Sequence, residues 1–335
     1  MSWQKRDDLG LQVVGHVFDC LKVEQEWGLE MPRGFSWWAD DLKQSIWSDI
    51  GMFQNSQNVF RVHSETDLFK GRGHSKDFEL HLASHMRGAT LSAVVYDTEA
   101  DTYRLHCSAY ATSDNEGFMD KLFMAASAIQ VAEAHEIGHH LAKQIGAIPA
   151  STGHPRAGIR TPASSVLASI PSWFTPAGQH PSRWEGNTQW KELERAMDRQ
   201  ALHFESDHHS RINAGFGWAI QRDGQPQVSS LSISTNEPHP QFGNGLMCRL
   251  KLPVKLPDAR VAHTAMELNN MERKEWLRCQ FMGSWCFDNG ELEFECFVPN
   301  GCYHSDILEA VSLSMAIRAE WVSEVFARWF SSAVH

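Results

Sequence analysis

Residues 280–330, QFMGSWCFDNGELEFECFVPNGCYHSDILEAVSLSMAIRAEWVSEVFARWF, decide the fold class of this chain. The runs QFMGSWCF and ELEFECFVP have the aromatic and apolar content of strands, and the Asp288-Asn289-Gly290 between them is a typical hairpin turn. Residues 305–330 then read as one long helix, with Ser305 and Asp306 available to cap its first turn. A hairpin followed by such a helix predicts an α+β fold, in which an antiparallel sheet carries a long closing helix on one face.

The same plan occurs once more in the first half of the chain. Residues 89–96 (ATLSAVVY) and 102–110 (TYRLHCSAY) resemble two strands, and DTEAD supplies the turn between them. Residues 118–142 follow as a helix. The two helices align at a spacing of roughly 188 residues, which places Gln130 opposite Arg318. The sequence therefore predicts two related units.

The remaining elements are clearer in the second half than in the first. A helix over 188–204, three strands within 215–254 and a helix over 256–274 precede the second hairpin, which gives the order αβββαββα. The first half is less regular. Its pattern predicts a helix around 11–21, a second helix over 34–47 (GFSWWADDLKQSIW), one strand over 58–66 and a helix around 75–85.

These patterns divide the chain into an N-terminal unit (1–148), a connector (149–187) and a C-terminal unit (188–335). The connector holds six of the thirteen prolines, at positions 149, 155, 162, 171, 176 and 181. Such a density excludes long helices and central strands. We expect either an extended segment that packs Trp173 and Trp184 on a surface, or a loosely ordered linker.

Composition restricts the classes of partner. The 335 residues carry a formal net charge of −11 and no dense Lys/Arg cluster, which argues against a nucleic-acid partner. No apolar run approaches the roughly 18 residues of a membrane span. The first residues do not read as a signal peptide. Seven cysteines without a CxxC pair are typical of reduced thiols, so we expect a cytoplasmic protein.

One resemblance to a known family can be stated. Residues 283–300 (GSWCFDNGELEFECFVPN), the helix over 307–326 and residues 236–253 (NEPHPQFGNGLMCRLKLP) resemble the type III secretion chaperone fold and the related YbjN-like domains. The resemblance covers the C-terminal half and, less closely, the N-terminal half. It implies a module that holds an extended segment of a partner protein or forms a dimer, with no chemistry of its own.

The residues His135-Glu136-Ile137-Gly138-His139 match the HExxH pattern of zinc peptidases. Four residues apart on a helix, His135 and His139 could hold one zinc ion with Glu136 as general base. The metzincin extension is absent, but Glu194, in an ExxxD sequence, could be the third ligand. Against this, histidines suit the last turn of a helix without any metal. The aligned positions in the second unit are Ser323, Glu324 and Ala327, so the architecture does not require ligands.

The leading expectation is therefore a non-enzymatic, chaperone-like or adaptor-like protein that binds another protein, with homodimer formation also compatible with the sequence. For such a protein we expect no catalytic residue, no metal and no other cofactor. The alternative is a gluzincin-like zinc metallopeptidase with His135, His139 and Glu194 as ligands and Glu136 as base.

Overall fold

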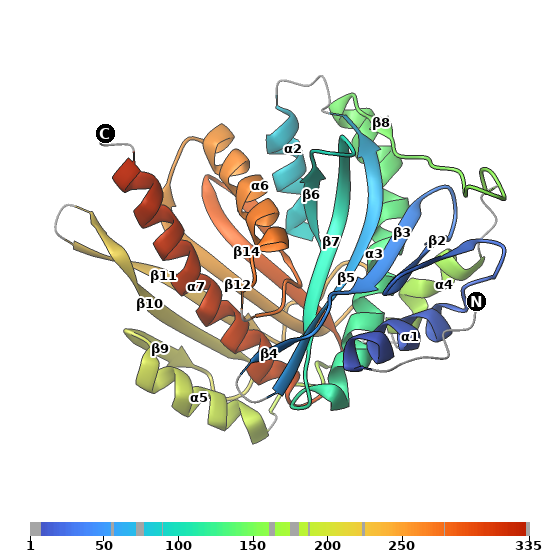
Figure 1. Cartoon of the computed structure of the whole chain (residues 1–335). Coiled ribbons are helices and arrows are strands. Elements are labelled where there is room, and N and C mark those ends of the chain that lie inside the picture. The colour runs from blue at the N-terminus through green and yellow to red at the C-terminus, as the bar shows by residue number, and fades with distance from the viewer. Residues whose placement is uncertain are drawn as a thin grey trace.

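A computed structural model describes residues 8–54, 57–71, 77–88, 90–160, 165–174, 181–186, 188–222, 225–277 and 279–332. Within these residues the chain forms two antiparallel sheets, each covered on one face by helices (Figure 1). The α+β architecture expected from the sequence is confirmed.

The first sheet belongs to the N-terminal unit and runs in the order β1-β2-β3-β5-β7-β6, with β4 and β8 paired to β5 at its ends. Helix α3 packs on β5 and β7, and α1 packs beside it on β3 and β5. The strands are β1 (Gly28–Met31), β2 (Gly34–Trp38), β3 (Lys43–Ser48), β4 (Met52–Gln54), β5 (Gln57–Lys70), β6 (Ala93–Asp97), β7 (Thr102–Ala111) and β8 (Ile148–Pro149). The helices are α1 (Leu9–Leu21), α2 (Phe78–His85) and α3 (Glu116–Ile145), with a 3-10 turn η1 (Met86–Gly88).

The second sheet belongs to the C-terminal unit and runs in the order β13-β14-β12-β11-β10-β9. Helix α7 crosses one face of it and α5 lies beside α7 (Figure 1). The strands are β9 (His203–Ser206), β10 (Arg211–Arg222), β11 (Gln225–Ser234), β12 (Gly245–Lys255), β13 (Ser284–Asp288) and β14 (Glu291–Pro299). The helices are α5 (Thr188–Gln200), α6 (Asp258–Lys274) and α7 (Ile307–Ser332), with a 3-10 turn η2 (Asn300–Cys302).

The two units share one topology. Each unit begins with a helix and four strands, continues with a second helix, and ends with a hairpin and a closing helix; β4 and β8 are additions in the N-terminal unit. The order of the corresponding strands is the same in the two sheets. The predicted order for the second half lacked only the short edge strand β9. The predicted duplication therefore agrees with the fold.

One helix expected in the first half is wrong. Residues 34–47 form β2, a turn and β3. In β3 the side chains alternate between buried and half-buried positions, which is the period of a strand. Trp37 and Trp38 belong to β2 and are buried, so tertiary burial decides the conformation of a segment whose spacing also suits a helix.

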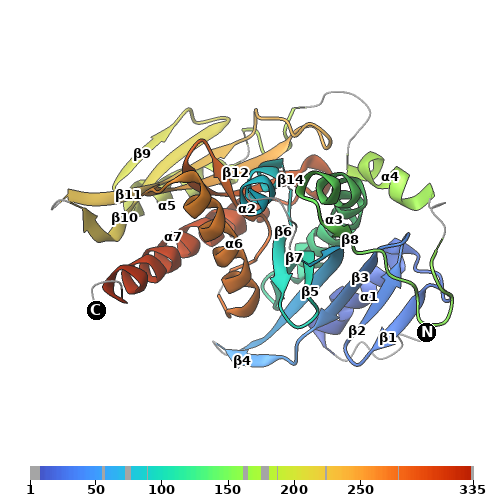
Figure 2. The ribbon, with the colours of Figure 1, turned by 90° about the horizontal axis from the view of Figure 1, so that it is seen from above.

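The two units are joined by reciprocal backbone bonds. Ser108 of β7 pairs with Phe281 before β13, and Phe297 N of β14 donates to Thr90 O before β6 at 3.0 Å. Helices α2 and α6 pack together between the sheets (Figure 2). One hydrophobic cluster contains buried side chains from both units. The units therefore form a single body with an internal interface.

The connector 149–187 is described in part, because residues 161–164, 175–180 and 187 lie outside the described residues. It begins with the second residue of β8 and contains helix α4 (Ser165–Phe174). Trp184 is fully buried and donates from Nε1 to His304 O of the C-terminal unit, whereas Trp173 is exposed. Among the described helices, none combines the length and the apolar character that crossing a membrane requires.

Candidate functional site

The HEIGH sequence lies in the last three turns of α3, and both histidines face the turn between β2 and β3. His135 Nδ1 is 3.4 Å from Asp40 Oδ2, and His139 Nε2 is 3.7 Å from Asp41 Oδ2. Burial raises the pKa of the Asp40 carboxyl, against the opposing effect of the nearby His135. Glu136 points elsewhere and accepts a hydrogen bond from Gln241 Nε2 at 2.6 Å.

The structure does not bring Glu194 to these histidines. Its carboxylate accepts from Ser206 Oγ at 2.5 Å and lies 3.1 Å from His208 Nδ1, on the outer edge of the C-terminal sheet. Among the described residues, the one set of three side chains with metal-ligating atoms within 4.8 Å of one another is Asp40, Asp41 and His135. The gluzincin ligand set therefore gains no support from this geometry.

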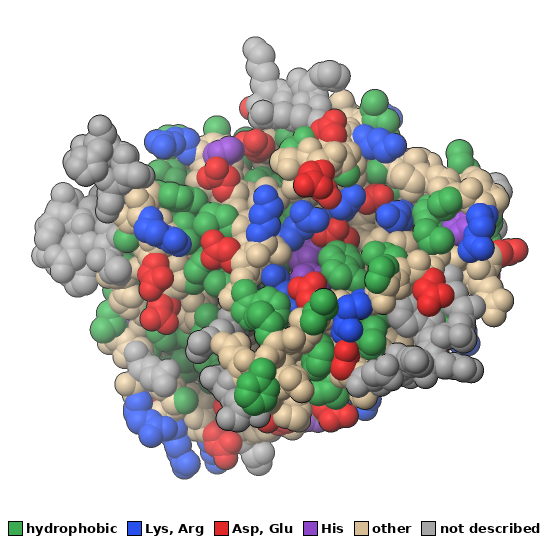
Figure 3. Space-filling model, in the orientation of Figure 1, with side chains coloured by type: hydrophobic (Ala, Val, Ile, Leu, Met, Phe, Trp, Pro, Cys, Tyr) green, Lys and Arg blue, Asp and Glu red, His purple; other side chains and the backbone are tan. Residues whose placement is uncertain are grey.

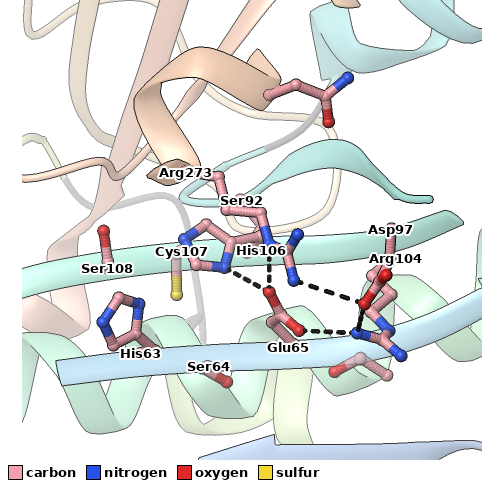
Figure 4. Close-up of polar contacts among 12 residues, drawn as sticks. His63, Ser64, Glu65, Ser92, Asp97, Arg104, His106, Cys107, Ser108 and Arg273 are labelled. Atoms are coloured by element: carbon pink, nitrogen blue, oxygen red, sulfur yellow. Dashed lines mark hydrogen bonds and ion pairs between the residues drawn. The ribbon is translucent and has the colours of Figure 1, made fainter. Parts of the chain in front are cut away.

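A second group of polar side chains lies on the face of the N-terminal sheet opposite α3 (Figure 4). Its centre is Glu65 on β5, which accepts from His106 Nδ1 at 3.1 Å, Arg273 Nε at 2.6 Å and Arg104 Nη1 at 3.2 Å. Burial would raise the pKa of Glu65, but the bonds from His106 and Arg273 hold it well below its usual range. Because Arg273 belongs to α6, this group fastens the C-terminal unit to the N-terminal sheet.

The same face contains two buried histidines that resemble parts of an acid–base site. His63 bonds Asp49 Oδ2 through Nε2 at 3.0 Å, and His106 bonds Glu65, so each histidine is oriented by a carboxylate. The remaining nitrogens, His63 Nδ1 and His106 Nε2, are buried without a hydrogen-bond partner. Burial lowers the pKa of both and brings that of His106 to about 4. The His106 ring is fully buried against Phe281, which leaves no access for a substrate.

A cavity of about 220 Å³ lies between α3 and the turn that contains His239 and Gln241. Glu133 lines it from the N-terminal unit. Its Oε1 accepts from Thr90 N at 3.1 Å and Thr90 Oγ1 at 2.8 Å, while its buried Oε2 has no partner. Burial raises the pKa of Glu133 to about 7. The cavity thus contains a carboxyl group that is partly protonated at neutral pH.

Three exposed apolar side chains of the N-terminal unit cluster on and beside β4. Ile50 is 78% exposed, Met52 44% and Phe53 75%. Figure 3 shows hydrophobic side chains at the surface over β4, with charged side chains of both signs around them. Strand β4 and the start of β5 reach beyond the body of the molecule (Figure 2). We call Ile50, Met52 and Phe53 the apolar ribbon.

Comparisons with known proteins identify no relative. No family model matches the chain, and neither the curated proteins nor the solved structures contain a match.

Sequence reasoning identified His135, Glu136, His139 and Glu194, but it missed the partners of the two histidines. Asp40 and Asp41 stand in a segment predicted as a helix, where two consecutive carboxylates look like a solvated face. A turn between two strands would have been the useful signal, because a turn can direct both carboxylates toward a helix packed on the sheet. Glu133 was also missed, in a helix whose buried residues are mostly apolar.

Proposed function

We propose that this protein is a non-enzymatic protein-binding module, chaperone-like or adaptor-like, that receives an extended segment of a partner protein at the apolar ribbon. The single observation that carries the proposal is the exposure of Ile50, Met52 and Phe53 together on and beside one projecting strand. Large apolar side chains that gather at a surface are typical of protein contacts rather than of solvent-facing positions.

The edge of β4 offers the backbone groups for such a contact. Among the described strands β4 pairs with β5 alone, and in this pairing Met52 lies opposite Val59 and Phe53 opposite Asn58. A partner strand could therefore add to β4 through main-chain hydrogen bonds, while its alternate side chains contact the ribbon. An exposed edge that is also apolar is otherwise an aggregation hazard, which favours a bound state.

The ribbon is held in a defined position. A Cβ at Gly51 would lie 2.3 Å from Phe60 Cε1, so the backbone packs directly on that ring. Ile50 follows Asp49, which is fixed by Asp49 N bonding to Arg61 O at 2.8 Å and by its side chain bonding to His63. A preformed edge lowers the conformational entropy lost when a partner binds.

We place this activity in the cytoplasm. The support is that all seven cysteines are free and that six of them are buried, as expected for a protein that folds without disulfides. A homodimer through the same ribbon is the main competing outcome, and it predicts a concentration-dependent mass in solution.

The test is affinity capture from a lysate of the source organism with three forms of the protein. The wild type and an Ile148→Asp/Ile159→Asp control, whose replaced residues are each 70% exposed away from β4, should retain the same partner. An Ile50→Asp/Phe53→Asp variant should lose it. Equal capture by all three forms would refute the ribbon as the binding surface. Hydrolysis of peptides by purified protein, without any specific partner, would refute the non-enzymatic reading.

A further inference from the structure

Four side chains with metal-ligating atoms converge where α3 passes the turn between β2 and β3. We propose that Asp40, Asp41, His135 and His139 bind one divalent transition-metal ion of the zinc type. This site does not depend on the protein-binding function and uses none of the ribbon residues.

Ligating atoms of three of these side chains lie close together, and the fourth side chain, His139, adjoins one of them. Ligating atoms of Asp40, Asp41 and His135 all lie within 4.8 Å of one another, and His139 Nε2 lies 3.7 Å from Asp41 Oδ2. Zinc binds histidine nitrogen and carboxylate oxygen at about 2.0–2.2 Å, so neighbouring ligands around one ion are separated by roughly 3–4 Å. Asp40, Asp41 and His135 are thus near the spacing of ligands around one ion, and His139 would complete the set by moving toward them.

An independent observation is that one oxygen of the deepest of these groups, Asp40, lacks a hydrogen bond. Asp40 is only 3% exposed, and its Oδ1 has no hydrogen bond; His135 Nδ1 is likewise buried and without one. A buried carboxylate oxygen without a partner costs about 1–3 kcal/mol or more, and such groups call for an explanation such as an ion. A cation between Asp40 and His135 would give both atoms a ligand bond.

The donor set favours a zinc-type ion over calcium or magnesium. Two imidazoles with two carboxylates suit borderline ions, whereas calcium and magnesium prefer oxygen ligands alone. The His135 and His139 side chains are 42% and 54% exposed, so an ion can enter from solvent. Arg160 acts electrostatically on Asp40 and opposes a cation there, but its guanidinium is also paired with Glu24 Oε2 at 2.6 Å.

Four protein ligands would fill a tetrahedral ion, which is the pattern of structural rather than catalytic zinc. The position of Glu136 agrees with this, because its carboxylate accepts a hydrogen bond from Gln241 and is not among the ligating atoms grouped around Asp40. The ion would fasten the β2–β3 turn to α3. The same turn is also held by Thr152 N, which donates to Asp41 O at 2.8 Å.

The experiment uses the full chain after removal of metal by a chelator. Zinc is added, excess is removed by gel filtration, and bound zinc is measured by elemental mass spectrometry beside a calorimetric titration and a thermal unfolding curve. The wild type should retain about one zinc ion per chain and unfold at a higher temperature with zinc. His135→Ala and Asp41→Asn should each weaken zinc binding by at least about tenfold, the smallest loss found when only a supporting group is removed.

The matched control is His140→Ala. His140 is adjacent to His139 but bonds Gln144 at 2.9 Å and belongs to the exposed face, so its replacement should leave zinc binding and the thermal shift unchanged. Because the chain has 18 histidines, the difference between variants decides the question rather than total zinc. No retained zinc in the wild type, or equal zinc in all four proteins, would overturn the site. Loss in His135→Ala but not in Asp41→Asn would overturn this ligand set.

Discussion

Replacement of Glu133 by glutamine should change how the stability of this protein depends on pH. Glu133 is 6% exposed, and burial raises the pKa of its carboxyl from 4.5 to about 7, although the two bonds from Thr90 oppose the shift. The folded protein keeps this proton until pH about 7, while the unfolded chain releases it near pH 4.5. The folded state therefore binds more protons between these values, and the free energy of unfolding falls as the pH rises through that window.

The size of the effect follows from the same two pKa values. At about 1.36 kcal/mol per pKa unit, the interval from 4.5 to about 7 corresponds to about 3 kcal/mol of stability lost by pH 8. Glutamine keeps the oxygen that accepts from Thr90 N and Thr90 Oγ1 but has no proton to lose. The amide nitrogen of the glutamine would lack a partner, just as Glu133 Oε2 does. This changes the free energy of unfolding of the variant by a similar amount at every pH, so the pH dependence is the quantity that tests the reasoning.

Urea unfolding of the wild type and Glu133→Gln at several values between pH 5 and pH 8 measures this directly. Between pH 5 and pH 8 the stability of the variant should rise by about 2 to 3 kcal/mol relative to that of the wild type. Glu320→Gln, at an exposed position of α7, should track the wild type at every pH. If the difference between Glu133→Gln and the wild type is the same at pH 5 and pH 8, Glu133 is ionised throughout and the reasoning from its burial is refuted.

Three further perturbations test the interior. Arg318→Met leaves the carboxylate of Glu272 buried without its ion pair and should cost about 3–5 kcal/mol in urea unfolding, most of which Arg318→Met/Glu272→Leu should recover. Glu65→Gln should lower the free energy of unfolding by about 3 kcal/mol at pH 7. Because the pKa of Glu65 is lowered, its stabilisation is present above pH 4.5 and is lost as the pH falls. The stabilities of the variant and the wild type should therefore converge at strongly acidic pH, and a constant difference between them would contradict the network. Six cysteines are buried and only Cys20 is half-buried, so a thiol reagent at pH 8 should modify Cys20 alone until the protein unfolds, as mass spectrometry would detect. Burial raises the pKa of Cys107 to about 12 and also raises the pKa of Cys20, so access of the reagent rather than acidity makes the difference.

The sequence predicted the elements that local pattern controls. The hairpin β13–β14 has an Asn-Gly turn between apolar runs, and the closing helices are long and apolar, so both could be recognised without any tertiary information. The alignment of Gln130 with Arg318 also has a physical basis, because each is a buried polar residue on the closing helix of its unit. Gln130 bonds Ser64 and Thr66, and Arg318 bonds Glu272.

The elements that the sequence did not predict are those whose formation depends on pairing with residues far away in the chain. β1 and β9 are short edge strands with little periodicity of their own, and each exists because it pairs with its neighbour. The turn that contains Asp40 and Asp41 has the composition of a helix surface. Its proximity to His135 arises only when α3 packs over the sheet. One sequence contains no signal for such a contact, so the ligands proposed for the metal could not be predicted.

Fusion of two related units in one chain permits differences that a dimer of identical chains cannot have. In the N-terminal unit, β4 and the apolar ribbon lie between β3 and β5. At the corresponding place, between β11 and β12, the C-terminal unit has the turn that contains His239, whose Nε2 bonds Gly88 O of the N-terminal unit. At the place of His135 and His139 it has Ser323 and Ala327. One unit thus offers the candidate binding features while the other supplies contacts that hold it, including Arg273 on Glu65. A variant that separates the units should therefore abolish partner capture even though every residue of the ribbon is retained.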